Sequence, residues 1–163
     1  MKKLHRILFL IGICLSLTGC PYESGVPIDK PSVKINKEIL GTWEYSHNHG
    51  ELFKVSQLDD FRYKIVKTKV NSESTDDYTA YTSIINGISF INLWESNTNE
   101  TSQKYAFYKM QLESKDKIRL SEVTENIDEK FNSSEELKAF ISINMKNSYF
   151  FGNNEIELVR QIR

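Results

Sequence analysis

The sequence predicts a mainly β domain, an antiparallel barrel or a sandwich of about eight strands with one amphipathic helix before the last strand. Three observations support this fold class. Apolar and polar residues alternate with a period of two through most of residues 37–163. Asn, Asp, Ser and Gly separate the alternating runs at short intervals. None of the three prolines lies in this part of the chain, which is therefore expected to form one compact domain.

The alternating runs place the strands in order. They span residues 42–47, 52–57, 61–70, 77–85, 88–94, 104–112, 117–123 and 155–162. Between the first two runs, Asn48, His49 and Gly50 predict a tight turn. Between the fourth and fifth, Asn86 and Gly87 are the strongest hairpin signal in the chain.

Alternation also assigns side chains to the two faces of a strand. In residues 61–70, Phe61, Tyr63 and Ile65 are expected on one face, opposed in part by the lysines of the run, Lys64, Lys67 and Lys69. In residues 104–112, one face is expected to carry Tyr105 and Phe107, and the other Ala106, Tyr108, Met110 and Leu112.

One segment has helical rather than strand periodicity. Ser133 can cap a helix while Glu136 reaches back toward it. The apolar side chains then fall on one helical face, with Lys138, Ser142 and Lys146 on the other; they are Leu137, Phe140, Ile141 and Met145. We expect this helix to end near Asn147 and to cover an open end or a flank of the barrel.

The first 20 residues resemble a bacterial lipoprotein signal peptide. A basic start precedes an apolar run at residues 7–17, which is shorter than the roughly 20 residues of a membrane-spanning helix. The run leads into Leu17-Thr18-Gly19-Cys20, which resembles the lipobox of that family. The resemblance implies cleavage after Gly19 and covalent lipid on the Cys20 sulfur. An ordinary secretory signal with an incidental cysteine is the alternative.

Cysteine and charge counts agree with this hypothesis. The second cysteine, Cys14, lies in the apolar run, so the processed chain would keep only Cys20 and could form no internal disulfide. Loss of residues 1–19 would leave 18 basic and 22 acidic side chains, a formal charge of −4. This balance argues against nucleic acid as a partner. It also indicates that lipid chains, rather than surface charge, would provide attachment to the membrane.

The chain then divides into three parts: the signal at 1–19, a lipidated cysteine with a flexible tether at 20–36, and the β domain at 37–163. All three prolines, Pro21, Pro27 and Pro31, lie in the second part. Proline stiffens the backbone and lacks a hydrogen-bond donor, so this stretch is expected to be extended. Residues 21–36 would reach at most about 50 Å and hold the domain off the bilayer.

A second resemblance appears at the first strand. Gly41-Thr42-Trp43 is similar to the G-x-W motif that opens the lipocalin-like barrels of the calycin group. In that family the tryptophan packs across the closed end and an arginine near the last strand covers it, a role that Arg160, or alternatively Arg163, would take here. The family's Thr-Asp-Tyr motif has only a near match at residues 75–78, too early in the chain. A core tryptophan of an unrelated sheet is the alternative interpretation of Trp43.

Residues with catalytic chemistry are few. His47, His49 and Glu51 alternate and could hold a metal on a strand, but the residues between them suit a turn, where histidines are merely solvated. The pairs Asp59-Asp60 and Asp76-Asp77 lie in predicted turns, where aspartate binds local backbone. We therefore expect no metal, no cofactor and no enzymatic activity.

Two functional hypotheses remain, with a hydrolase only as an outsider. The first is a barrel that binds a small apolar or amphipathic ligand, supported by many aromatic residues: Tyr45, Phe53, Phe61, Tyr63, Tyr81, Phe90, Trp94, Tyr105, Phe107 and Tyr108. The second is a filled barrel that docks on another envelope protein. The expected location is the cell envelope. Pro21, which is not the aspartate of an inner-membrane retention signal, favours the outer membrane where two membranes exist.

Overall fold

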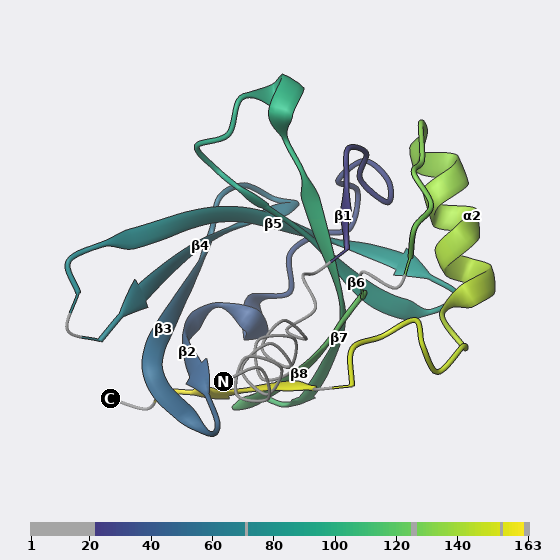
Figure 1. Cartoon of the computed structure of the whole chain (residues 1–163). Coiled ribbons are helices and arrows are strands. Elements are labelled where there is room, and N and C mark those ends of the chain that lie inside the picture. Colours follow the sequence, from purple (N-terminus) through teal and green to yellow (C-terminus); the bar gives the residue numbers. More distant parts are fainter. Residues whose placement is uncertain (1–21, 71, 125–126, 154, 162–163) are drawn as a thin grey trace, which may run out of the picture.

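The computed structural model describes residues 22–70, 72–124, 127–153 and 155–161, so the expected signal, its cleavage site at Gly19, Cys20 and Arg163 lie outside the described residues. Eight antiparallel strands close into a barrel (Figure 1). They are β2 (Gly41–Tyr45), β3 (Asn48–Gln57), β4 (Arg62–Lys69), β5 (Thr75–Ile85), β6 (Ile88–Glu95), β7 (Tyr105–Ser114), β8 (Lys117–Glu122) and β9 (Ile156–Arg160). Each strand pairs with the next, and β9 also pairs with β2, which closes the barrel and excludes the sandwich.

The predicted β5–β6 hairpin is confirmed. Asn86 and Gly87 have φ values of 50° and 80°, and Ile85 pairs with Ile88 across the turn. The first turn was predicted wrongly. It lies at residues 46–47 instead of 48–50, because Asn48 already pairs with Tyr45 and its side chain accepts a hydrogen bond from the Gly50 amide at 3.1 Å.

The helix is confirmed and lies on a flank of the barrel. Helix α2 (Ser134–Asn144) is capped by the Ser133 hydroxyl, which accepts a hydrogen bond from the Glu136 amide at 3.2 Å. Glu136 reaches back to the amide of Asn132, one residue earlier than expected. In Figure 1, α2 runs beside the β5–β6 side of the barrel. Its buried residues Leu137 and Ile141 pack on the outer face of the sheet.

The apolar residues therefore form two clusters, one on each side of the barrel wall. The outer cluster joins the sheet to α2 and includes Ile85, Phe90, Phe107, Leu137, Ile141 and Phe150. The inner cluster lies at one end of the barrel and consists of Ile39, Trp43, Tyr63 and Ile118. Both faces of β5, β6 and β7 contact apolar partners. The side chains of these strands are therefore buried whether they point into the barrel or out of it.

The N-terminal segment departs from the expected tether. Strand β1 (Glu23–Ser24) pairs with the start of β7, and Ile28 is fully buried in the outer cluster. The Ile28 amide donates to the Asn92 side chain at 2.9 Å, and the Asp29 carboxylate accepts from Ser83 at 2.5 Å. The flexible tether is thus wrong for residues 22–36. Bends at residues 25–26, 28–29, 31 and 33 interrupt the segment, and side chains between Pro27 and Pro31 bind it to the barrel.

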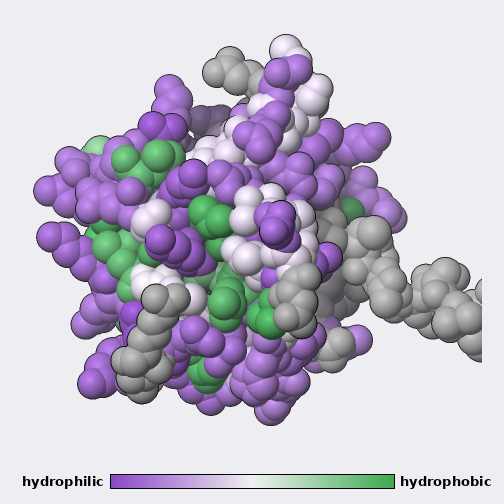
Figure 2. All heavy atoms as spheres, turned by 90° about the vertical axis from the view of Figure 1, so that its left-hand side faces the viewer, coloured by the Kyte–Doolittle hydropathy of each residue, from purple (hydrophilic) through white to green (hydrophobic). Residues whose placement is uncertain are grey.

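The two ends of the barrel differ. At one end lie the β3–β4, β5–β6 and β7–β8 turns, with Gly41 and Arg160; we call this the closed end. At the other end lie the β2–β3, β4–β5 and β6–β7 connections; we call this the mouth. Figure 2 shows the face that carries the β4–β5 connection, where hydrophilic side chains dominate and apolar ones are visible between them. No helix in the described parts of the chain is long and apolar enough to span a bilayer.

Candidate functional site

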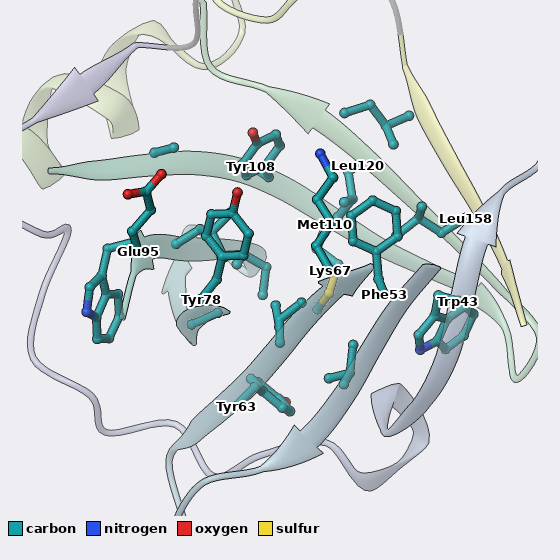
Figure 3. Close-up of a pocket in the computed structure, with 18 of the residues that line it drawn as sticks. Trp43, Phe53, Tyr63, Lys67, Tyr78, Glu95, Tyr108, Met110, Leu120 and Leu158 are labelled. Atoms are coloured by element: carbon teal, nitrogen blue, oxygen red, sulfur yellow. The ribbon is translucent and has the colours of Figure 1, made fainter. Parts of the chain in front are cut away.

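The interior of the barrel holds a cavity of about 570 Å³. It extends from the inner cluster at the closed end to the mouth, and Figure 3 shows the side chains that point into it. Its volume falls within the range of roughly 300–1,000 Å³ that is usual for small-molecule sites.

Trp43 forms the floor of the cavity at the closed end. Its ring is fully buried, and its indole N–H donates to the Ile39 carbonyl at 2.8 Å. Ile39 belongs to the short 3-10 helix η1 (Lys37–Ile39), which directly precedes β2. The tryptophan is therefore held at both its backbone and its ring nitrogen.

Arg160 covers the outer side of this floor. Its guanidinium carbon lies 4.3 Å from the Trp43 ring centroid, and its nitrogens donate to the carbonyls of Leu40 and Lys115, both at 2.8 Å. A side chain at Gly41, whose φ is +142°, would overlap the same guanidinium. The structure thus brings Gly41, Trp43 and Arg160 together.

The closed half of the cavity is apolar. Its lining comes from alternate residues of several strands, including Phe53, Val55, Met110, Ile118, Leu120 and Leu158. Figure 3 shows Phe53, Met110, Leu120 and Leu158 on the side of Trp43. These side chains are all apolar, and the Tyr63 hydroxyl of the inner cluster accepts a hydrogen bond from the Asn36 amide at 2.7 Å, so this half suits a hydrocarbon or an aromatic group.

Polar groups lie nearer the mouth. The Lys67 ammonium group contacts the Glu51 carboxylate at 3.0 Å, and both side chains are about one-fifth exposed. The hydroxyl-bearing rings of Tyr45, Tyr78 and Tyr108 also line the cavity. In Figure 3, Tyr78, Tyr108 and Glu95 lie on the side away from Trp43, and Lys67 lies between them and Phe53, with which it pairs across β3 and β4. We call Tyr45, Lys67, Tyr78 and Tyr108 the polar ring.

Electrostatics fix the protonation of the polar ring. Burial raises the pKa of Tyr108, with the nearby Glu122 carboxylate adding to the effect. Burial likewise raises the pKa values of Tyr45 and Tyr78. For Lys67, burial opposes the charged form, but the hydrogen bond and charge of Glu51 outweigh it and raise the pKa. At neutral pH the ring therefore carries three phenolic hydroxyls and one ammonium group.

The charges that line the cavity are balanced. Lys67 and Lys104 contribute two positive groups, and Glu23 and Glu95 contribute two negative ones. Because Glu51 already neutralises Lys67, an anion that entered would have to compete with this carboxylate. Because the groups at the cavity have no excess positive charge once Glu51 is counted, the lining disfavours an anionic ligand.

The predicted aromatic residues divide between the two sides of the wall. Tyr45, Phe53, Tyr63 and Tyr108 line the cavity, and Trp94 lies at its edge, where its ring packs on those of Tyr81 and Tyr105. In contrast, Phe90 and Phe107 belong to the outer cluster, with Tyr105 packed against it. Tyr81 also lies outside, where its hydroxyl donates to the Asp29 carbonyl. The aromatic content alone thus overstated the lining by counting residues that hold α2 and the N-terminal segment.

The histidines and the aspartate pairs lie outside the cavity, and the turn predicted for Asp76 and Asp77 is wrong, because both belong to β5. His49 Nδ1 is 3.1 Å from a Glu44 carboxylate oxygen and its side chain is mostly exposed. Among the described residues no group of three His, Cys, Asp or Glu side chains could hold a metal ion. Asp59 accepts hydrogen bonds from the amides of Phe61 and Arg62, the local backbone role expected of a turn aspartate. These contacts lower the Asp59 pKa, the Phe61 amide most strongly.

Several polar lining residues were missed from the sequence, among them Lys67, Tyr78 and Glu23. Lys67 was expected opposite Tyr63 and Ile65, although an even spacing of two puts it on their face, which the period of β4 could have revealed. Tyr78 stands in the same relation to Ala80 on β5. Glu23 lay in the supposed tether, and no sequence signal placed it at the mouth.

Comparison with protein-family models, curated proteins and solved structures finds no match to this chain.

Proposed function

We propose that the protein is a lipid-anchored bacterial lipoprotein whose barrel, similar to the lipocalin-like barrels, binds a small amphipathic ligand in its cavity. The cavity carries the proposal, since its apolar closed half and its polar ring match the two ends of an amphiphile. The filled barrel expected of an interaction module would leave no such volume. The protein would act by binding and not by catalysis.

The distribution of polar groups supports a defined orientation of the ligand. The apolar part would lie against Trp43, Phe53 and Leu158, where burial contributes about 25 cal/mol per Å². The head group would lie at the polar ring, where phenolic hydroxyls can donate and accept hydrogen bonds. Since Glu51 neutralises Lys67, the lining supports a head group that is uncharged or zwitterionic rather than anionic.

Two naphthalene dyes test the cavity. N-phenyl-1-naphthylamine is uncharged, and 1-anilinonaphthalene-8-sulfonate is the same molecule with an added sulfonate. Both of the chain's tryptophans, Trp43 and Trp94, line the cavity, so a bound dye should be excited by energy transfer from them. With a chain that begins at Tyr22, we expect one uncharged dye per chain, bound at least tenfold more tightly than its sulfonate.

The variant Glu51→Gln sharpens this test. Removing the carboxylate frees Lys67, so affinity for the sulfonate should rise severalfold while affinity for the uncharged dye stays the same. Glu113→Gln is the matched control, because Glu113 pairs with Lys117 and Arg119 away from the cavity. Absence of transfer for both dyes would refute ligand binding. Equal response of the two dyes to Glu51→Gln would refute the assignment of the polar ring.

The anchor rests on the sequence alone, on Leu17-Thr18-Gly19-Cys20 after a short apolar run. Lipid on Cys20 would hold the protein in the cell envelope, at the outer membrane where two membranes exist. Cys20→Ser should give an uncut precursor without lipid, measured as intact mass by electrospray. A processed, membrane-bound Cys20→Ser chain would refute the anchor.

A further inference from the structure

We infer that the head group of the ligand contains an ammonium group, which lies at the mouth among the three tyrosines of the polar ring and the carboxylates beside them. The inference rests on the proposed function and narrows its head group from uncharged or zwitterionic to zwitterionic. Its basis is the set of side chains that surround these tyrosines.

Two tyrosines of the polar ring lie directly opposite a glutamate on the neighbouring strand. Tyr78 on β5 pairs with Glu95 on β6, and Tyr108 on β7 pairs with Glu122 on β8. Side chains opposed in this way leave the same face of a sheet, with their Cβ atoms about 4.5–5.5 Å apart. Figure 3 shows Glu95 on the same side of the cavity as Tyr78 and Tyr108. Each of these two rings is therefore accompanied by a carboxylate.

Acidic groups outnumber basic ones around the three tyrosines. Burial raises the pKa values of these tyrosines most, and five carboxylates add to this effect, whereas Lys67 lowers the pKa values of Tyr45 and Tyr78. The five carboxylates belong to Glu23, Glu51, Asp76, Glu95 and Glu122. Lys104 adds a second cation to the lining. The charges near the polar ring are thus negative in sum, which attracts a cation.

The hydroxyls of the three tyrosines are available to a ligand. Tyr45, Tyr78 and Tyr108 all line the cavity, and none of their hydroxyls forms a hydrogen bond with another residue that the structure describes. The Tyr45 ring is fixed by an edge-to-face contact with Phe53, with the centroids 5.1 Å apart. Aromatic rings attract a cation over their faces, and several rings around one point recognise quaternary ammonium groups.

The mouth offers a separate partner for each charge of a zwitterion. Glu23 and Glu95 line the cavity, and within the described chain neither carboxylate has a cation at ion-pair distance. Glu51, in contrast, is already held by Lys67 at 3.0 Å. Lys104 also lines the cavity without an ion pair to a described residue, so it can meet the anionic group. The ammonium group would then lie between the tyrosines and the two free carboxylates.

The size of the cavity restricts the ligand to one chain. At roughly 30 Å³ per heavy atom, the share of a water molecule in the liquid, a volume of 570 Å³ holds about 19 heavy atoms. This number suits one alkyl chain of medium length with a compact head group, and it is too small for a lipid with two chains. The chain would occupy the apolar closed half, which leaves the head group at the polar ring.

Competition for the uncharged dye tests the head group. N-phenyl-1-naphthylamine is displaced by three amphiphiles with the same decyl chain, each below its micelle-forming concentration and at slightly alkaline pH. Decyltrimethylammonium carries the ammonium group alone, decylphosphocholine carries it in a zwitterion, and decyldimethylamine N-oxide is uncharged. We expect both ammonium compounds to displace half of the dye at concentrations at least fivefold lower than the N-oxide. Circular dichroism checks that the barrel stays folded in each amphiphile.

The variant Glu95→Gln tests the carboxylate opposite Tyr78. It should reduce the preference for decyltrimethylammonium over the N-oxide at least threefold. Glu113→Gln is the matched control, because it removes the same charge from the chain but lies away from the cavity, and it should keep the preference. Tyr78→Leu removes the ring and should reduce the preference more than Tyr78→Phe, which retains the ring.

The outcomes separate this inference from the proposed function. Absence of energy transfer to the dye would refute ligand binding itself. A bound dye that the N-oxide displaces as well as decyltrimethylammonium does would overturn the ammonium site while ligand binding stands. Displacement by decylphosphocholine alone would also overturn it, since the phosphate would then be the recognised group. Equal losses of preference in Glu95→Gln and Glu113→Gln would assign the preference to the overall charge of the chain and overturn the site as well.

Discussion

A methyl group at Gly41 should disrupt the closed end of the barrel. The Cβ of Gly41→Ala would overlap the Arg160 guanidinium, and the φ of +142° is a conformation that alanine rarely adopts. Arg160 would have to leave its place over Trp43 and give up its bonds to the Leu40 and Lys115 carbonyls.

Three contributions set the magnitude. Backbone strain at a non-glycine residue costs about 1–3 kcal/mol. Loss of the cation–π contact costs roughly 0.5–2 kcal/mol. Each hydrogen bond from a charged donor is worth about 1.5–3 kcal/mol, but the Arg160 side chain is 22% exposed, so water replaces part of this. We expect Gly41→Ala to lower the free energy of unfolding by about 3–5 kcal/mol in total.

A double-mutant cycle with Arg160→Ala tests the cause. Without the guanidinium, Gly41→Ala should cost only its backbone strain, about 1–3 kcal/mol. Urea unfolding followed by tryptophan fluorescence measures all four chains, since Trp43 reports on the closed end. An equal cost of Gly41→Ala with and without Arg160 would show that the guanidinium does not constrain this position.

Three further predictions concern the core and pH. Trp43→Ala should lower the free energy of unfolding by about 3–5 kcal/mol, since the ring is fully buried; an unchanged melting temperature would contradict this. Asn92→Ala should cost about 2–4 kcal/mol in urea unfolding, because it removes the hydrogen-bond partner of the buried Ile28 amide and one of the two hydrogen bonds of the Ser83 hydroxyl; a cost below 1 kcal/mol would contradict their burial as a unit. Burial raises the pKa of six tyrosines, so folded chains keep phenolic protons that unfolded chains lose, and stability should fall as the pH rises above about 10. They are Tyr22, Tyr45, Tyr63, Tyr78, Tyr81 and Tyr108. Absorbance at 295 nm follows the ionisation of the tyrosines. Ionisation of all six at the ordinary tyrosine pKa in the folded protein would contradict this prediction.

The barrel and its helix could be predicted because their signals are local. A period of two, turn residues and the Ser133 cap each act within a few residues, and they placed all eight strands and α2. The position of the N-terminal segment could not be predicted. It depends on Asn92, which lies 64 residues from its partner Ile28, and composition alone makes a proline-rich stretch look like a free linker.

The cavity could be predicted only in part, because alternation separates two faces without saying which one is enclosed. On β7, Tyr105 and Phe107 were separated correctly from Ala106 and Tyr108, yet the larger pair lies outside. Such an assignment requires the partners that cover the outer face, namely α2 and residues 22–36. Alternation can therefore group the residues of a strand by face, but it cannot say which group lines the cavity.

Small side chains explain why this barrel is not filled. An eight-stranded barrel is just wide enough for its own side chains to fill the interior. Here Ala80 and Ala106 point inward on β5 and β7, while their neighbours Tyr81 and Phe107 point outward and anchor the N-terminal segment and the outer cluster. The large rings thus stabilise the wall from outside, and the two alanines leave the mouth half of the interior open. The same exchange of large for small residues creates the cavity and holds residues 22–36 on the outer wall, so both features depend on one property of the sequence.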